Sequence, residues 1–399
     1  MKVLFLTSVN HPQVKYEAEH LGKKLNLTYT VIPILSKKQL PYAFKCLFKS
    51  FPEIGVSLLK LRVPPLPQSF LYILMSSIIL SERKLRNKKY DLIYAHWLYP
   101  AGFIGLILSK ILNCKIVSVV WGYDVQVIHG VKDYGIQGLS RIIAKTVIEK
   151  SDLIIANHKI HRILAQYISC PKAHGRILYV PPAIPDISLD AQDEFTTELK
   201  EKLHFILDKL RRKDIVLYSP SLRPLYGVRE FVRAAQIVSN SVKDCVFIIV
   251  GDGELEGEVI KFINEKGLGD KVVLVGKVSH ESMKVLYKLS TLVCDLAYPG
   301  TGTTALEALC FGKPVIGIES PKTVIIHGVD GFLIKRGDYK SLANYIMTIL
   351  EDHRLRERLS INARKTFEEK FIIQKRINRF LKIFNDLINY GHREGSHKT

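Results

Sequence analysis

Residues 298–312 place a single acid, Glu307, on a short apolar helix one turn after a loop of small residues. Such a loop presents free backbone N–H groups and the positive end of the helix dipole, which together form an anion site suited to phosphate. Because Glu307 follows Thr303 by four positions, both lie on one helix face, and the carboxylate could accept hydrogen bonds from sugar hydroxyls. The alternative is an acid that only stabilises the helix dipole behind capping threonines. The residues expected to line the anion site are Thr301, Gly302, Thr303 and Thr304.

Two further loops in the second half of the chain follow predicted strands. The stretch VGDGELEGEV contains Gly251 and Gly253 and could form a ligand-edge loop, although ordinary turns share this composition. The stretch SPSLRPLYGV contains Arg223, which could hold a diphosphate through two parallel N–H bonds. An isolated surface arginine is the alternative.

In the first half, aromatic and acidic side chains stand at the ends of two predicted strands. His96 ends the first of these strands, and Trp121 and Asp124 follow the second. An aromatic ring beside a carboxylate at a strand end is suited to binding a sugar. A buried tryptophan and a helix-capping aspartate are the alternative.

Short apolar runs that alternate with amphipathic stretches predict the elements that must position these residues. Buried parallel strands separated by helices are typical of an α/β, doubly wound sheet. A proline-rich and then acidic break at 181–195 separates two such series, so we expect two tandem Rossmann-like domains facing a cleft, with ligands at the carboxyl ends of the strands. The predicted strands are 2–7, 29–34, 91–96, 115–122, 152–157, 176–182, 214–220, 245–253, 271–278, 290–297 and 313–320, and the clearest helices are 101–112, 138–151 and 228–238.

The positive charge of the chain is concentrated in its first half. The 399 residues carry a formal net charge of +20, and residues 1–185 hold 25 Lys and Arg against 9 Asp and Glu, a balance of +16. This implies an anionic partner, such as nucleic acid, anionic lipid or a phosphorylated substrate, unless the lysines are merely solvated. No aromatic–basic repeat or groove-reading motif is present, so nucleic acid is not expected as the partner.

Other features indicate a cytosolic protein at a membrane surface. The six cysteines form no CxxC pair, so neither a zinc site nor a disulfide framework is predicted. The N-terminus lacks a long apolar region and a cleavage site, and the apolar run 70–80 is too short to span a bilayer. Residues 35–89 mix lysine with large apolar residues at helical spacing, which fits a helical insertion in a membrane interface or, alternatively, one packed on the sheet.

The ordered set of these loops resembles family 4 of the retaining GT-B glycosyltransferases. FIIVGDGELE, LAYPGTGTTALEALCFGKPVIG and IIHGVDGFLI resemble the nucleotide-sugar half, and YDLIYAHWLYPAG, WGYDV and SDLIIANHK resemble the acceptor half. The resemblance implies a GT-B fold over nearly the whole chain. The domains expected are 1–185 for the acceptor, with 35–89 facing the membrane, a linker at 186–213, 214–370 for the nucleotide sugar, a C-terminal helix at 371–390 and a tail at 391–399.

The resemblance also implies a role for each matching residue. Glu307 corresponds to the second glutamate of the family's pair, which holds the donor ribose, and Thr301, Gly302 and Thr303 correspond to the diphosphate-binding backbone. Asp124 corresponds to the acid near the reacting sugar. No metal is expected, because the helix dipole and basic side chains serve the leaving group. Val278 is expected beside the nucleobase, with Gly251 and Gly253 in the same pocket, and His96 and Trp121 on the acceptor or sugar side.

The chain departs from the family pattern at positions that would neutralise the diphosphate and orient the sugar. Pro299 stands at the place of the first glutamate, Tyr226 at the place of a lysine and Ser221 at the place of an arginine, for which Arg223 is a nearby substitute. Trp121 replaces a histidine.

These features predict a retaining hexosyltransferase-type enzyme at the inner face of the cell membrane. It would transfer a sugar from a UDP- or GDP-type donor to a hydroxyl of a lipid-linked or otherwise membrane-associated glycan, with Asp124, Arg223 and Glu307 at the reaction site. The alternative is a catalytically silent GT-B subunit that binds a partner transferase or a lipid.

Overall fold

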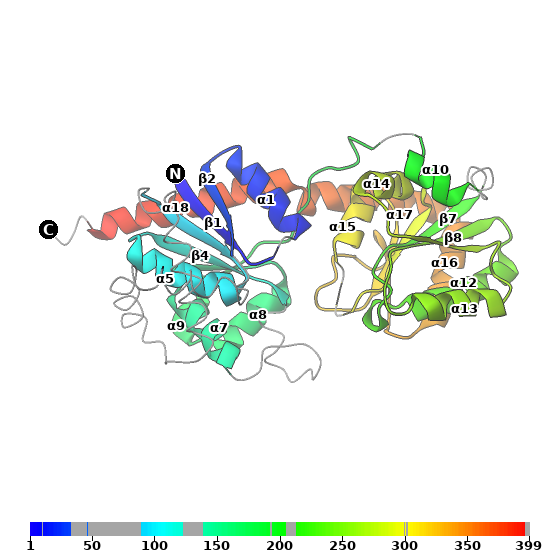
Figure 1. The fold of residues 1–399 in the computed structure, drawn as a ribbon, viewed down its shortest axis with the longest axis horizontal. Coiled ribbons are helices and arrows are strands. Elements are labelled where there is room, and N and C mark those ends of the chain that lie inside the picture. The colour runs from blue at the N-terminus through cyan, green and yellow to red at the C-terminus, as the bar shows by residue number, and fades with distance from the viewer. Residues whose placement is uncertain are drawn as a thin grey trace. The chain divides into compact units, whose positions relative to one another are not determined.

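The structure is a computed structural model, and its described part forms two compact units (Figure 1). Unit 1 comprises Met1–Pro182 together with Ile373–Thr399, and unit 2 comprises Ala183–Ile372. The chain therefore crosses between the units twice, and its C-terminal helix belongs to the first of them. The residues described are 1–9, 11–32, 46, 89–122, 139–191, 194–204, 213–298, 300 and 302–395.

Unit 1 is built on a six-stranded sheet in which every pairing is parallel, in the order β2-β1-β3-β4-β5-β6. Its inner strands are rich in Val, Ile and Leu and buried along almost their whole length, as expected of parallel strands covered on both faces. The edge strand β2 contains only half-buried and exposed residues. The strands are β1 Lys2–Thr7, β2 Asn26–Val31, β3 Leu92–His96, β4 Lys115–Val120, β5 Leu153–Ala156 and β6 Ile177–Tyr179.

Helices cover both faces of this sheet, with α1 and α18 on one face and α5, α7, α8 and α9 on the other (Figure 1). Helix α5 is apolar and buried along most of its length, which marks it as an interior helix. The C-terminal helix α18 extends to Gly395, beyond the helix end expected at residue 390. The helices are α1 Pro12–Gly22, η2 Leu98–Gly102, α5 Phe103–Ile111, α7 Leu139–Lys150, α8 Lys159–Ile168, α9 Pro171–His174 and α18 Ile373–Gly395.

Unit 2 repeats the architecture with the strand order β12-β11-β10-β7-β8-β9, again with parallel pairings. The short strand β12 lies at the edge of the sheet and was not among the predicted strands, because two of its four residues are only half-buried and its apolar run is short. The strands are β7 Asp214–Tyr218, β8 Cys245–Val250, β9 Val272–Gly276, β10 Leu292–Asp295, β11 Val315–Ile318 and β12 Gly331–Ile334.

The helices of unit 2 also lie on both faces of their sheet, with α12, α13 and α16 on one and α14, α15 and α17 on the other (Figure 1). Several begin at side-chain caps that accept a backbone hydrogen bond, such as Ser279 before α14 and Asp338 before α16. The helices are α10 Thr197–Leu203, η4 Pro224–Tyr226, α12 Val228–Ser241, α13 Glu256–Glu265, α14 His280–Leu289, α15 Thr303–Cys310, α16 Tyr339–Glu351, α17 His353–Thr366 and η5 Phe367–Phe371.

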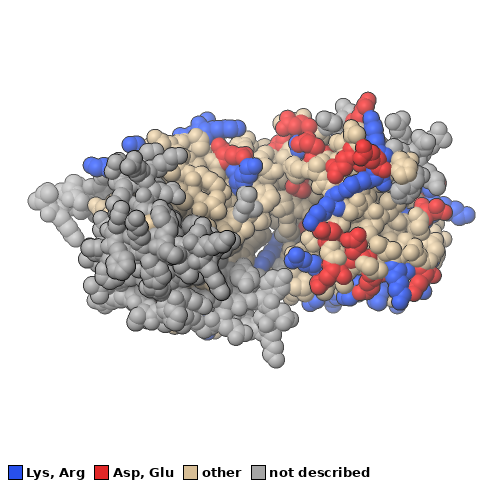
Figure 2. Space-filling model, in the orientation of Figure 1, with Lys and Arg blue, Asp and Glu red and all other residues tan. Residues whose placement is uncertain are grey.

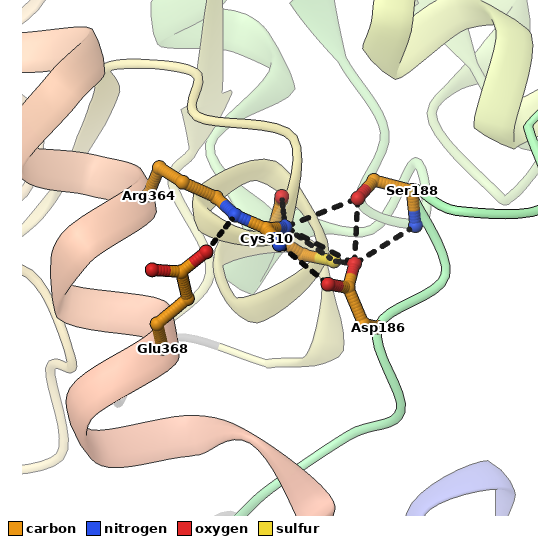
Figure 3. A network of polar contacts seen from close by, with 5 residues as sticks. All are labelled: Asp186, Ser188, Cys310, Arg364 and Glu368. Atoms are coloured by element: carbon orange, nitrogen blue, oxygen red, sulfur yellow. Dashed lines mark hydrogen bonds and ion pairs between the residues drawn. The ribbon is translucent and has the colours of Figure 1, made fainter.

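Part of the expected linker 186–213 is packed firmly on unit 2. Arg364 of α17 holds Asp186 with two hydrogen bonds of 3.0 and 2.5 Å and also reaches Ser188 and the carbonyl of Cys310 (Figure 3). Burial opposes ionisation of Asp186, yet the hydrogen bonds from Arg364, Ser188 and Cys310 lower its pKa to about 2. Helix α10 follows in the same segment with two fully buried leucines. This segment is therefore part of the second unit rather than a free tether.

The surface of unit 2 carries both signs of charge. In the right-hand part of Figure 2, its Asp and Glu side chains lie among Lys and Arg side chains, in agreement with the small net charge of residues 186–399. No helix within the described ranges combines the length and apolar character that a bilayer crossing needs. The expected membrane-facing insertion 35–89 lies outside the described residues apart from Cys46 and Lys89.

Candidate active site

The carboxyl edge of the unit 2 sheet brings together loops that are far apart in the sequence. Strands β7 and β10 are neighbours in the sheet, and the strands that follow each of them in the chain are added on opposite sides. The position between them is therefore the switch point of the sheet, where open α/β sheets bind ligands. Ser219, the first residue after β7, lies with its Oγ 3.3 Å from Thr304 Oγ1 on α15 and 3.1 Å from the Tyr287 hydroxyl on α14. These contacts fix the start of α15 beside the end of β7.

Glu307 lies one turn into α15, on the side of the helix that faces α14. Its side chain is 12% exposed, and Oε1 lies 3.4 Å from His280 Nε2. The buried Tyr287 hydroxyl also bonds to this carboxylate, and burial first and the Glu307 charge second raise the pKa of Tyr287. The hydrogen bond to Glu307 raises the pKa of His280, although partial burial opposes it. The carboxylate is thus held in place at the surface and remains within reach of a ligand.

An acid that the sequence reasoning did not single out, Asp295, organises the loop before α15. Asp295 ends β10, is 1% exposed and accepts the N–H groups of Gly302 at 3.2 Å, Ala297 at 3.4 Å and Ala305. Burial raises its pKa to about 6, against the opposing effect of these hydrogen bonds. The Gly302 N–H, expected to meet the donor diphosphate, is directed at Asp295 in this structure. Thr303 stands at the first position of α15, where the helix itself supplies no acceptor for the N–H.

The predicted glycine loop after β8 is packed against the turn after β7. Gly253 has a φ of +156°, and a Cβ there would lie 2.4 Å from the Leu222 carbonyl oxygen, so only glycine fits. Leu222 N donates to Asp252 O at 2.9 Å, and Gly251 N donates to Gly276 O at 2.9 Å. The ends of β7, β8 and β9 are therefore joined by backbone hydrogen bonds along one edge.

Arg223 and Val278 lie along that same edge, in the loops after β7 and β9. Arg223 is exposed and directly follows Leu222, which is bonded to the glycine loop. Val278 is half-buried, two residues before His280 begins α14. The structure thus brings Gly251, Gly253, Arg223, Val278, Gly302, Thr303 and Glu307 to the carboxyl edge of one sheet.

The carboxyl edge of the unit 1 sheet carries a cluster of aromatic rings. Trp97 and Trp121 follow β3 and β4, and their indole rings stack with centroids 5.1 Å apart at 19°. His11, after β1, lies 5.2 Å from Trp121. All three rings are partly exposed. Trp97 has a φ of +72°, a conformation that costs a non-glycine residue on the order of 1–2 kcal/mol and that is found most often at functional sites.

His96, expected on the acceptor or sugar side, is wholly buried and cannot touch a ligand directly. Its Nδ1 accepts the Trp121 indole N–H at 3.2 Å, and its Nε2 lies 3.1 Å from Glu17 Oε1. Burial lowers the pKa of His96, with the Glu17 carboxylate opposing, so the ring serves as a neutral acceptor. His96 is therefore a positioning residue for the Trp121 ring. The prediction of direct sugar contact failed because a histidine at the end of a parallel strand can be covered from both faces of the sheet.

A buried ion pair lies behind His96. Arg376 of α18 donates to Glu17 at 2.6 Å, and Tyr94 donates to the same carboxylate at 2.5 Å. Glu17 and Arg376 are each 4% exposed. Burial raises the pKa of Glu17, but Arg376, His96 and Tyr94 together bring it down to about 2. Helix α18 thus supports the aromatic cluster indirectly: Arg376 holds Glu17, Glu17 lies against His96, and His96 holds Trp121.

Two predicted site residues, Asp124 and Thr301, lie outside the described residues, as does Pro299. Within the described ranges, no group of three or more His, Cys, Asp or Glu side chains is placed to hold a metal ion.

Comparisons with known proteins relate both halves of the chain to sugar-transferring enzymes. The family model for glycosyl transferases group 1 matches residues 200–366, and that for glycosyl transferase 4-like proteins matches residues 53–158. An alpha-D-kanosaminyltransferase of Streptomyces kanamyceticus is 29% identical over 154 residues, which cover 38% of this chain and 40% of the relative. The match therefore spans about two fifths of that relative's length.

A longer match and a structural one cover most of the chain. The UDP-Gal:alpha-D-GlcNAc-diphosphoundecaprenol alpha-1,3-galactosyltransferase of Escherichia coli is 25% identical over 79% of this chain and 80% of its own. Anabaena Alr3699/HepE, solved in complex with UDP, superposes with a TM-score of 0.72 at 18% identity over 97% of this chain and all of its own. The prediction from the motifs is confirmed: the chain has the GT-B fold of two Rossmann-like units and belongs to the group 1 glycosyltransferases, related to family 4.

Proposed function

We propose that the protein transfers a hexose, with retention of anomeric configuration, from a UDP-sugar to a hydroxyl of a lipid-linked glycan. The observation that carries the proposal is Glu307, a carboxylate fixed between His280 and Tyr287 at the switch point of the unit 2 sheet. The Escherichia coli relative, whose name specifies UDP-Gal and a diphospholipid acceptor, supports the choice of donor and acceptor. The basic first half of the chain suits an acceptor that carries phosphate.

On the donor side, Glu307 accepts hydrogen bonds from the ribose hydroxyls. The N–H groups at the start of α15, with Thr301 and Thr303, and the guanidinium of Arg223 stabilise the charge that develops on the leaving diphosphate. Val278 and the loop of Gly251 and Gly253 border the nucleobase. We propose that no metal ion is required, because the helix and Arg223 supply the positive charge. Asp124 acts beside the reacting sugar.

A transfer assay tests this function. Purified protein is supplied in turn with UDP-glucose, UDP-galactose and UDP-N-acetylglucosamine and with a synthetic diphospholipid-linked sugar, and the product's anomeric coupling constant is read by NMR. The proposal expects one donor to yield a product with the α-configuration of the donor. Inverted configuration would overturn the mechanism. UDP binding without any hydrolysis or transfer would instead favour the silent GT-B subunit. That alternative is supported by Pro299 and Tyr226, which replace a glutamate and a lysine of the family pattern.

UDP affinity is expected to fall as the pH is lowered from 8 to 6. The hydrogen bond to Glu307 raises the pKa of His280, so the protonated ring persists to higher pH and competes with the ribose for that carboxylate. Titration calorimetry should show a roughly three- to fivefold weaker UDP affinity at pH 6, the range of a partly exposed ion pair, and a weaker pH dependence for His280→Gln. Tighter UDP binding at pH 6 would mean that His280 instead binds the diphosphate.

On the acceptor side, we propose that the stacked rings of Trp97 and Trp121 bind the apolar face of an acceptor sugar. Trp121→Ala is expected to raise the acceptor KM on the order of tenfold and leave the UDP dissociation constant unchanged, because only one substrate loses its contact. Trp121→Phe keeps the stacking ring but loses the N–H bond to His96, so a smaller effect is expected. An equal loss of UDP affinity would contradict the assignment.

We propose a cytoplasmic, peripheral location at the inner face of the cell membrane. The support is the charge of the first half of the chain and the lipid-linked acceptor in the name of the Escherichia coli relative. No nucleic-acid partner is proposed.

A further inference from the structure

The outer surface of α8 exposes two large apolar side chains among cations. Ile163 is 58% exposed and Tyr167 is 68% exposed, and their spacing of four residues places them side by side on the helix. Lys159 and Arg162 are exposed on the same arc. The opposite arc, with Leu164 and Ile168, is buried against unit 1. The helix therefore has two separate apolar faces, and only one of them belongs to the core.

This surface lies in a stretch without negative charge. From Leu153 to Pro185 the chain contains no Asp or Glu, whereas Lys159, Arg162, Lys172 and Arg176 are all present. Of these cations, Lys159, Arg162 and Lys172 are exposed. Every Lys, Arg, Asp or Glu side chain on α8 and α9 is therefore a cation.

Two acids among the described residues that precede this stretch, Glu149 and Asp152, are already bound. Glu149 of α7, which packs beside α8 and α9, accepts the backbone N–H of Cys170 at 2.9 Å and lies 3.9 Å from Lys145. Asp152 lies 3.0 Å from Lys115 and accepts the backbone N–H of Ile116. Helix α7 itself adds a further exposed apolar residue, Ile142, which is 44% exposed.

We propose that the outer face of α8, with Ile163 and Tyr167 inserted and Lys159, Arg162 and Lys172 at the head groups, docks unit 1 on an anionic lipid bilayer. A basic amphipathic helix with exposed Ile and Tyr gains both apolar burial and attraction to anionic lipid at such an interface. An acidic protein surface would satisfy the cations but would leave Ile163 and Tyr167 without an apolar contact. A nucleic acid could stack a base on Tyr167 but would still leave Ile163 without an apolar contact. The inference extends the proposed function by naming the surface that reaches the membrane. It does not depend on sugar transfer.

Vesicle binding by the full chain tests the proposal in the absence of any substrate. The protein should float with vesicles of phosphatidylglycerol and phosphatidylcholine mixed equally, and it should remain unbound with phosphatidylcholine alone. Lys159→Gln/Arg162→Gln is expected to weaken binding on the order of twentyfold, since each basic residue near an anionic surface contributes about fivefold. Ile163→Ser/Tyr167→Ser is expected to weaken it at least tenfold.

A control is Ile260→Ser, which removes another exposed apolar side chain, 43% exposed, from α13, a helix with Glu256 and Glu258 in its first turn. This variant should bind vesicles as the wild type does. All substitutions are at exposed positions, and circular dichroism checks that each variant is folded. No binding to anionic vesicles, or α8 variants that bind as well as Ile260→Ser, would overturn the proposal. Binding to RNA or to an acidic protein that displaces vesicles would overturn it as well.

A probe at Cys170 supplies an independent readout at the end of the same surface. Cys170 is exposed, whereas Cys114 is half-buried and burial raises its pKa to about 12, so a maleimide at neutral pH reacts first at Cys170. An environment-sensitive fluorophore at Cys170 should shift to the blue on adding anionic vesicles. An unchanged spectrum while the protein floats would show that a different surface binds the lipid. Failure of sugar transfer would leave both readouts unaffected, so the two proposals are tested separately.

Discussion

Replacement of Glu307 by alanine is expected to weaken UDP binding on the order of a hundredfold. The carboxylate is held on α15 by His280 and Tyr287 at the switch point of the unit 2 sheet, where the ribose is placed in the proposed function. Charge-assisted hydrogen bonds to two ribose hydroxyls contribute about 3 kcal/mol in total, which corresponds to this factor in the dissociation constant. Titration calorimetry with UDP measures the change.

The control for this variant is another glutamate of unit 2 at a distance from the sheet edge. Glu265→Ala removes an exposed carboxylate from α13 that lies 3.8 Å from Lys261, and it should leave UDP affinity within about twofold of the wild type. Glu307→Gln retains the shape of the side chain and is expected to fall between the two. Undiminished UDP affinity in Glu307→Ala would remove the main support for the donor site.

Replacement of Arg376 by methionine is expected to destabilise unit 1 by about 3–5 kcal/mol at pH 7. The guanidinium donates to Glu17 at 2.6 Å, to the Val180 carbonyl at 2.9 Å and to Asn157 at 2.8 Å, all in buried surroundings. Its removal leaves the Glu17 charge buried without its cation, which costs several kcal/mol. Urea unfolding followed by tryptophan fluorescence reports on this unit, because both tryptophans of the chain lie there.

The pH dependence separates lost charge pairing from lost packing. In the wild type the pKa of Glu17 is lowered to about 2, so its contribution is present above pH 4.5 and is lost as the pH falls toward 2. In Arg376→Met, Glu17 keeps only His96 and Tyr94 as partners against its burial, so it is more readily protonated. The difference in unfolding free energy between wild type and variant should therefore narrow as the pH falls below 4.5. Arg379→Met, an exposed arginine of the same helix, should cost less than about 0.5 kcal/mol. If Arg376→Met lowers the unfolding free energy by the same amount at pH 7 and pH 4, the ion pair is not the cause of the loss.

The buried strands were predictable because parallel strands covered on both faces read as unbroken apolar runs. The runs at 2–7, 91–96 and 214–220 match β1, β3 and β7 within two residues. The prediction for β2 was displaced toward 29–34, whereas the strand spans Asn26–Val31. That strand is at the sheet edge and half-exposed, so its alternating polar residues carry a weak signal and the apolar residues after it attracted the prediction.

The candidate site was predictable where backbone conformation or a motif marks it, and not where burial decides the role. The glycine loop could be predicted because position 253 must be glycine, since no side chain fits there against Leu222. His96 reads as a ligand-facing residue, yet it is buried and holds Trp121. Asp295 reads as the end of an apolar strand, yet it binds three N–H groups of the next loop. Such long-range pairings depend on sheet order, which the chain's local pattern does not specify.

A crystal structure of the protein with UDP tests the central claim most directly. The account predicts UDP at the carboxyl edge of the unit 2 sheet, with its ribose hydroxyls within hydrogen-bond distance of Glu307, its diphosphate at the start of α15 near Arg223, and its base beside Val278. UDP bound at any other place, or a ribose that makes no contact with Glu307, would contradict it.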